Sequence, residues 1–294
     1  MSLDLTGINK KVVKHVILID SADRDTVSYT QGKYTIMLPL EYKQVCKVRL
    51  VTAEVPFSFY INSSAKLTST FNIKIGANTQ TCTIPDGSYT IYTLSDAITN
   101  AVAANATFKA LSPAFTIVVS IDPATLKMTM TGTHQFSLDT TTTLTSTTLW
   151  GLAYNMGFVK NALHDSTQVD ATTFTLTGTK PTNTIPNKYI ILDINNLNFM
   201  DETQPVPLNN RSLAFGGNGT HKSAFAKIPL TGAPFDLILF DAGNSHYNEV
   251  IMNPVLGRLD RIQIGWHYHD GTIIDFNDMD HSLTLEIECL EHMM

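Results

Sequence analysis

The stretch VCKVRLVTAEVPFSFYI, residues 45 to 61, has the composition of one long β-strand that is broken at Pro56. Proline has no amide hydrogen to donate to a neighbouring strand, so it stops ordinary ladder pairing in a sheet. We therefore expect the strand to end near Pro56 and the chain to turn a corner of a β-sandwich there.

Strand-like segments flank this stretch on both sides. Upstream, KHVILIDSADRD (residues 14–25) is an apolar run of the buried type that ends in a Ser/Asp turn, and KYTIMLPL (residues 33–40) alternates between two faces. Downstream lie five more candidates with no helical segment between them: YIILDINNL, FAKIPL, DLILF, RIQIGWHYH and HSLTLEIECLE. Strands near both ends that enclose a different middle block suit Greek-key connections. The sequence therefore predicts an all-β protein, a single jelly-roll β-sandwich made of residues 1–65 and 180–294.

The middle block, residues 66–179, predicts an inserted small α+β subdomain. It holds short strand candidates (TFNIKI, QTCTIP, FTIVVSID, LKMTMTG and TFTLTG) and a helix candidate, TLSDAITNAVAAN. Thr93 and Asp96 resemble a capping box at the start of that helix. Its apolar residues fall on one face at helical spacing: Leu94, Ala97, Ile98, Ala101 and Val102. LWGLAYNMGF predicts a second, short helix stopped at Gly157.

The overall composition excludes several classes of protein. The formal charge of −6 leaves no broad basic surface, so direct binding of nucleic acid is not expected. No apolar stretch is long enough to cross a bilayer, and the N-terminal residues lack the apolar core of a secretory signal, so we expect a soluble chain made in the cytosol. Cys46, Cys82 and Cys289 are widely spaced and odd in number, which favours reduced, buried thiols.

Several segments together resemble one viral family. These are the turn from Asp20 to Asp25, the Y-x-I-x-L-P strand from Tyr34 to Pro39, and the A-E-x-P-x-S-x-Y segment from Ala53 to Tyr60. IPDGSYTIYTLSDAI (residues 84–98) and the closing LGRLDRIQIGWHYHDGTIIDF and DHSLTLEIECLE segments also match. Taken in order, they are similar to the single jelly-roll penton and minor capsid proteins of the nucleocytoplasmic large DNA viruses.

The resemblance implies a structural protein of an icosahedral capsid and not an enzyme. It favours a penton, a homopentamer at the five-fold vertices of the virion that contacts the major capsid protein and other minor capsid proteins. An internal minor capsid or cement protein beneath the major capsomers is the first alternative. A carbohydrate-binding jelly-roll module is the second.

His267 and His269 are the strongest candidates for metal ligands, because residues two apart on a strand point to the same face. In the cupins, metal enzymes with a related β-fold, a His-x-His motif is followed by a Glu four or five residues on. Ile273 and Ile274 stand at those positions here. We therefore expect the two histidines to face solvent or a partner, and we predict no metal site.

Two acidic clusters could suggest calcium. One holds Asp20, Asp23 and Asp25 around Arg24, and the other holds Asp275, Asp278 and Asp280 beside His281. Neither has the ligand spacing of an EF-hand loop. Asp side chains more often stabilise tight turns by accepting hydrogen bonds from nearby amides, and that is the interpretation we favour.

Catalytic and sugar-binding sites have little support in the sequence. No G-x-S-x-G elbow is present, and Cys289 shares a strand face with Leu283, Leu285 and Ile287, which predicts a buried thiol. Sugar sites use exposed aromatic platforms, but Trp150 and Trp266 both fall on apolar faces and are expected to pack in a core. We thus predict no catalytic, cofactor-binding or metal-binding residues and no cofactor.

Overall fold

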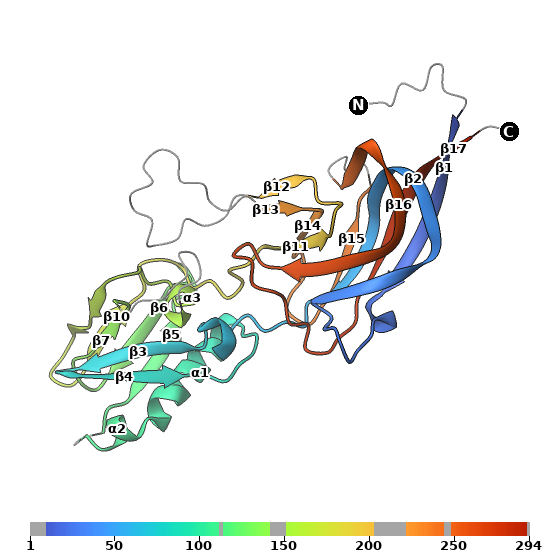
Figure 1. Ribbon diagram of the computed structural model, residues 1–294. Helices are drawn as coiled ribbons and strands as arrows, with labels where there is room; N and C mark the ends of the chain where they lie inside the picture. The colour runs from blue at the N-terminus through green and yellow to red at the C-terminus, as the bar shows by residue number, and fades with distance from the viewer. Residues whose placement is uncertain (1–9, 112–113, 142–150, 203–221, 244–247, 293–294) are drawn as a thin grey trace, which may run out of the picture. The chain divides into compact units, whose positions relative to one another are not determined.

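The computed structural model describes residues 10–111, 114–141, 151–202, 222–243 and 248–292, and these form two compact units (Figure 1). Unit 1 comprises residues 10–59, 187–202 and 222–292. Unit 2 comprises residues 60–186 and is inserted between two parts of unit 1.

One sheet of unit 1 places the first and last strands of the described residues side by side. Its antiparallel order is β1 (Lys10–Asp20), β17 (Ser282–His292), the second half of β2 (Lys33–Pro56) and β15 (Leu237–Asp241). β1 and β17 pair along their full length, from Lys10 opposite His292 to Asp20 opposite Ser282. β2 ends at Pro56, as predicted.

The second sheet of unit 1 shares two long strands with the first. Its order is the first half of β2, the end of β16 (Glu249–His267), β11 (Tyr189–Ile194) and β14 (Ala226–Pro229). β16 follows β2 across both sheets, with register shifts between Ile251 and Leu256 and between Leu259 and Arg261. Such irregularities bend a strand and let it pass from one sheet to the next. Two sheets of four strand segments joined in this way form a jelly roll, which confirms the predicted all-β fold class.

The core of unit 1 is built from alternate residues of facing strands. β17 buries one of its faces: Leu283, Leu285, Ile287 and Cys289. β16 does the same with Ile262, Ile264 and Trp266. Fully burying one large apolar side chain contributes about 1.5–3 kcal/mol, so these alternating faces stabilise unit 1. A short pair, β12 (Met200–Glu202) and β13 (Lys222–Ala224), and the 3₁₀ turn η1 (Ser21–Asp23) complete the described part of unit 1.

Unit 2 is the predicted α+β subdomain. One sheet has the order β4 (Asn78–Thr83), β3 (Thr70–Ile75), β7 (Ser137–Asp139) and β8 (Leu163–Asp165). The other has the order β5 (Ile117–Ile121), β6 (Met128–Gly132), β10 (Phe174–Thr177) and β9 (Thr167–Gln168). The helical elements are η2 (Ser64–Lys66), α1 (Ile91–Ala104), α2 (Ala106–Lys109) and α3 (Leu152–Asn155). None of the helices in the described residues is long and apolar enough to cross a membrane.

Helix α1 begins earlier than its sequence pattern predicts. The N-cap is Thr90, whose hydroxyl accepts a hydrogen bond from the Thr93 amide, while the Thr93 hydroxyl accepts one from the Thr90 amide. The predicted pairing of Thr93 with Asp96 is therefore wrong, because Thr can close the capping box at the third helical position in place of Glu or Gln. The predicted apolar face is correct: Leu94, Ile98 and Val102 are fully buried.

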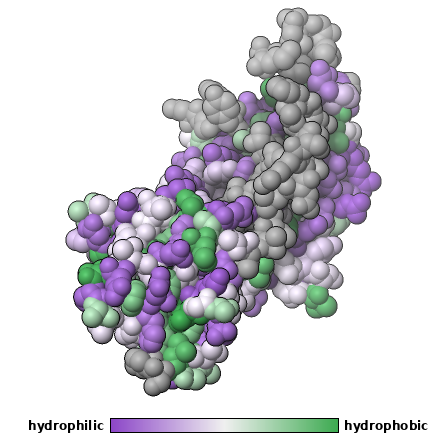
Figure 2. All heavy atoms as spheres, turned by 90° about the vertical axis from the view of Figure 1, so that its left-hand side faces the viewer, coloured by the Kyte–Doolittle hydropathy of each residue, from purple (hydrophilic) through white to green (hydrophobic). Residues whose placement is uncertain are grey.

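Unit 2 has a hydrophobic core of its own, which runs from Phe71 to Leu176 and includes the buried face of α1. The face of unit 2 seen in Figure 2 is mostly hydrophilic, with small separate apolar patches. Whether this unit folds by itself, with boundaries at residues 66 and 179, stays a prediction.

Candidate binding surfaces

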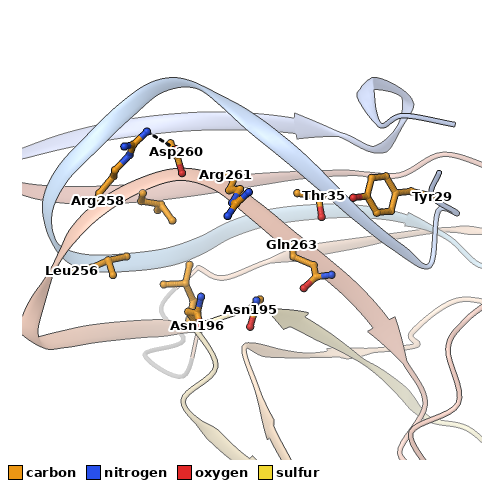
Figure 3. Close-up of a pocket in the computed structure, with 11 residues that line it drawn as sticks. Tyr29, Thr35, Asn195, Asn196, Leu256, Arg258, Asp260, Arg261 and Gln263 are labelled. Atoms are coloured by element: carbon orange, nitrogen blue, oxygen red, sulfur yellow. Dashed lines mark hydrogen bonds and ion pairs between the residues drawn. The ribbon is translucent and has the colours of Figure 1, made fainter. Parts of the chain in front are cut away.

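A polar groove lies on unit 1 beside the second sheet and has a volume of about 470 Å³ (Figure 3). Its lining comes from the end of β16, the start of β2, the turn after β11 and Tyr29. The polar side chains around it are Tyr29, Thr35, Asn195, Asn196, Arg258, Asp260, Arg261 and Gln263. The described lining contains no histidine, cysteine or serine.

The two arginines of this groove differ in their contacts. Arg258 forms ion pairs with Asp260 at 2.7 Å and with Glu41 at 3.5 Å. Arg261 is exposed, and its guanidinium forms no hydrogen bond or ion pair with a described residue. A guanidinium presents several donors in a fixed plane, and Gln263 and the two asparagines add both donors and acceptors. The groove therefore presents both hydrogen-bond donors and hydrogen-bond acceptors.

Two edge strands of the first sheet expose apolar side chains. On β1, Val16 and Leu18 are 68% and 72% exposed. On β15, Leu237 and Leu239 are 58% and 69% exposed. The run KHVILID was predicted to be of the buried type, and in the single chain this is wrong for one of its faces. Strands that are apolar on both faces usually have both faces covered, so these edges favour contact with another surface.

The predicted histidine pair does not lie on one solvent-facing surface. His267 is only 1% exposed, so its predicted exposure is wrong. Its Nδ1 donates to the Tyr268 carbonyl at 2.8 Å, and its Nε2 lies 3.0 Å from Asp193 Oδ2 on the adjacent strand β11. Both ring nitrogens therefore face protein groups and not a shared metal position.

His269 lies beyond the end of β16, where strand alternation no longer applies. It is half-buried, and its ring packs edge-on against Tyr189 with the centroids 6.1 Å apart. Within the described residues, no group of three or more His, Cys, Asp or Glu side chains could hold a metal ion.

The two acidic clusters act mainly in turns, as predicted. Asp20 Oδ1 accepts from the Ala22 amide at 2.9 Å, Asp25 Oδ1 from the Val27 amide at 3.1 Å, and Asp275 Oδ1 from the Asn277 amide at 2.9 Å. Asp23 and Asp278 are exposed.

The structure also joins the two clusters, which the sequence analysis did not foresee. Asp280 Oδ1 accepts from Ser21 Oγ at 2.8 Å and pairs with the Arg24 guanidinium. Partial burial opposes ionisation of Asp280, but the hydrogen bonds from Ser21 and Arg24 outweigh it and lower the pKa of this carboxyl. Arg24 thus offsets a charge of the distant cluster and not those of its own neighbours.

His281 lies beneath this junction and is the residue that the sequence analysis missed. It is 3% exposed, and its Nε2 accepts from the Trp266 indole at 2.8 Å and lies 3.1 Å from the Tyr34 hydroxyl. Burial lowers the pKa of His281 to about 4 and raises the pKa of Tyr34. His281 is therefore a neutral part of the core, and its position beside an Asp in the sequence gave no signal of this.

The remaining predictions concern thiols and aromatic platforms. Cys46, Cys82 and Cys289 are all free and buried, as predicted. Burial raises the pKa of each thiol, that of Cys82 to about 12, which makes them poor nucleophiles. Trp266 is fully buried, which confirms its predicted place in the core, whereas Trp150 lies outside the described residues.

Comparisons with known proteins identify the fold. No family model matches the chain, and no curated protein matches it in sequence. Among solved structures, the penton protein of mavirus is similar with a TM-score of 0.51 and 11% identity, over 95% of this chain and 99% of that one. A structure of the Sputnik virophage has a TM-score of 0.46 and 13% identity, over 95% of this chain and 98% of the other.

The likeness to the mavirus protein extends over both units. Only 5% of this chain lies outside the match, whereas residues 60–186 make up a far larger part of the chain. The match must therefore include most of unit 2. The fold that the sequence resemblance implied is thus confirmed. The chain is similar in fold, over nearly its whole length, to the penton protein of mavirus.

Proposed function

We propose that this protein is a structural subunit of an icosahedral virus capsid, and that it forms the penton at the five-fold vertices. The observation that carries the proposal is the likeness to the mavirus penton protein, which covers the jelly roll and the inserted unit together. The match extends beyond the jelly-roll sandwich, a fold that by itself hosts many unrelated functions.

The surfaces of unit 1 support a role based on contact. Exposed apolar residues on two edge strands and a polar groove with an exposed arginine resemble the core and rim of protein interfaces. On this proposal the partners are further copies of this chain, the major capsid protein and other minor capsid proteins, and the protein is located in the virion. The proposal needs no substrate, cofactor or catalytic residue.

Antibody labelling of purified virus particles in the electron microscope tests this proposal. Antibodies raised against the recombinant chain are expected to label intact particles at the vertices only. Labelling that requires the shell to be opened would favour an internal minor capsid protein beneath the capsomers. Labelling spread over the facets would contradict both positions.

Binding to a glycan array tests the carbohydrate-binding alternative. The buried position of Trp266 removes one of its two candidate platforms. We expect no saturable binding of any glycan, and a saturable, competable signal would reopen that alternative.

A further inference from the structure

The first sheet of unit 1 ends in two strands that have the properties of complementary edges. In the described residues, β1 pairs only with β17, and β15 pairs only with β2. Each strand therefore has one side along which its backbone donors and acceptors have no strand partner. Edge strands with exposed apolar side chains are ready templates for pairing with another chain.

Strand directions allow these two edges to pair between copies. β1, β17, β2 and β15 alternate in direction, because each neighbouring pair is antiparallel. β1 and β15 thus run in opposite directions. If a second copy is placed beside the first in the same orientation, its β15 runs antiparallel to the β1 that it meets, and the sheet continues without a break.

One antiparallel register matches the side chains of the two edges. It places Leu18 opposite Leu237, Val16 opposite Leu239 and Lys14 opposite Asp241, all on the outer face. On the inner face the same register places Ile17 opposite Ile238, both of which are buried in their own subunits. A shift by one residue would put outer side chains opposite inner ones.

Shifts by two residues lose this match. In one direction, Asp241 faces Val16 and Leu237 faces Asp20. In the other, Asp241 faces Val12 and Leu239 faces Lys14. Cross-strand apolar and opposite-charge pairs stabilise a sheet, so the matched register is favoured over its neighbours.

We infer that β1 of one subunit pairs with β15 of a second copy of this chain, in the register that joins Val16 to Leu239. The inference rests on the proposed function and specifies the contact between its subunits. The two patches differ, so the contact is heterologous, which is the type that closes into a ring when the rotation between neighbours divides a full turn. A two-fold dimer would instead bring β1 against β1 or β15 against β15.

In this contact between copies, the Lys14–Asp241 pair favours one strand direction and register. The apolar pairs Leu18–Leu237 and Val16–Leu239 supply attraction. In the single chain, Lys14 Nζ lies 3.2 Å from both Glu286 and Glu288 of β17. Asp241 accepts from the Gly243 amide at 2.8 Å. Because Lys14 already has two acidic neighbours, its attraction to Asp241 is partly offset. Polar substitution of the leucines should consequently weaken association more than neutralising Lys14.

Disulfide trapping tests the contact and its register. Facing residues of an antiparallel pair have Cα atoms about 4.5–5.5 Å apart, which suits a disulfide. An equimolar mixture of Val16→Cys and Leu239→Cys chains should give a covalent dimer on mild oxidation. Either variant alone should give little, and a mixture of Val16→Cys with Leu237→Cys should cross-link at least several-fold less. The three native thiols are buried and provide a low background.

Two results would overturn the inference. One is dimer formation by Val16→Cys alone at the rate of the mixture, which would indicate a two-fold β1–β1 contact. The other is the absence of dimer from the Val16→Cys and Leu239→Cys mixture at the highest soluble concentration, because trapping captures even short-lived contacts.

A non-covalent measurement separates this inference from the proposed function. Leu239→Lys should weaken self-association in sedimentation at least ten-fold, whereas Val118→Lys, at a 65% exposed site on β5 of unit 2, should leave it unchanged. If both variants associate and reach the vertices like the native chain, the edge contact is wrong but the penton proposal stands. If the native chain is found away from the vertices, the proposed function fails whatever the cross-links show.

Discussion

His281 is an ionisable residue buried in the jelly-roll core in its neutral form. Its Nε2 accepts from Trp266, so the neutral ring carries its proton on Nδ1. Nδ1 is buried without a hydrogen-bond partner among the described residues. Protonation would place a charge next to Arg24 and turn the Nε2 acceptor into a donor that faces the indole N–H.

The first prediction follows from this environment. The pKa of His281 is about 4 in the folded protein, below its ordinary value of 6.5. A depressed histidine pKa means that its contribution to stability is complete above pH 6.5 and is lost as pH falls from 6.5 towards 4. Each pKa unit corresponds to about 1.4 kcal/mol, so the free energy of unfolding should fall by up to about 3 kcal/mol over this range.

Urea unfolding at pH 7, 6, 5 and 4 measures this effect. His281→Gln should be less stable at pH 7 but should lose much less stability between pH 6.5 and 4. His15→Gln, on strand β1, is the matched control and should keep the native pH dependence. Asp280 also has a lowered pKa, but its contribution is lost only as pH falls below its ordinary value of 3.8. An unchanged pH dependence in His281→Gln would contradict this account.

The second prediction concerns the three thiols. Burial raises the pKa of Cys46, Cys82 and Cys289, so little thiolate is present at neutral pH and reagents cannot reach it. Reaction with a chromogenic disulfide reagent should be slow in the native protein and should give three thiols per chain in denaturant. Rapid reaction of one thiol in the native state would indicate an accessible cysteine and would reopen a catalytic interpretation.

Burial on single strands could be predicted from the sequence in some cases and not in others. Alternation on β17 correctly predicted which residues are buried, because a strand with one covered face has a period of two. The same rule failed for His269, which lies beyond the end of β16. It also failed for His267, whose burial depends on Asp193 of a neighbouring strand 74 positions earlier in the chain.

Two further features could not be predicted because they depend on contacts between segments that are distant in the sequence. The junction of Ser21 and Arg24 with Asp280, and the core position of His281, depend on β1 and β17 lying side by side. No local sequence pattern predicts that these two strands pair. The exposed face of β1 was predicted as part of a buried-type run because composition indicates that a strand face is apolar, and not whether its own subunit covers it.

The third prediction tests the start of helix α1. Because Thr90 is the N-cap, Thr90→Ala should destabilise unit 2 by about 1 kcal/mol. Asp96→Ala should change its stability by less than about 0.5 kcal/mol, as is usual for a substitution away from a cap. Thermal unfolding of the two variants beside the native protein measures this difference. The reverse order would instead support a capping box of Thr93 and Asp96.

At the scale of the whole molecule, the two units have separate cores. The buried cluster of unit 2 lies between Phe71 and Leu176, whereas the core of unit 1 is built from its own strands. A unit with its own core could in principle fold alone.

The fourth prediction is that the units are separable. Replacing residues 67–179 with a short Gly/Ser linker removes the whole cluster of unit 2 and leaves the strand pairs of unit 1. We expect a soluble, β-rich protein with a cooperative thermal transition, measured by circular dichroism. An aggregated or unfolded product, together with a single transition in the full chain, would show that the insertion belongs to the main core and that its boundaries are wrong.

Five-fold averaged density of the intact virus particle would show whether this chain forms the capsid vertex. We expect five copies of the jelly roll around each five-fold axis, with β1 of each copy beside β15 of the next. Density at the vertices that fits another protein, with this chain placed beneath the major capsomers or absent from the particle, would rule out the proposed penton.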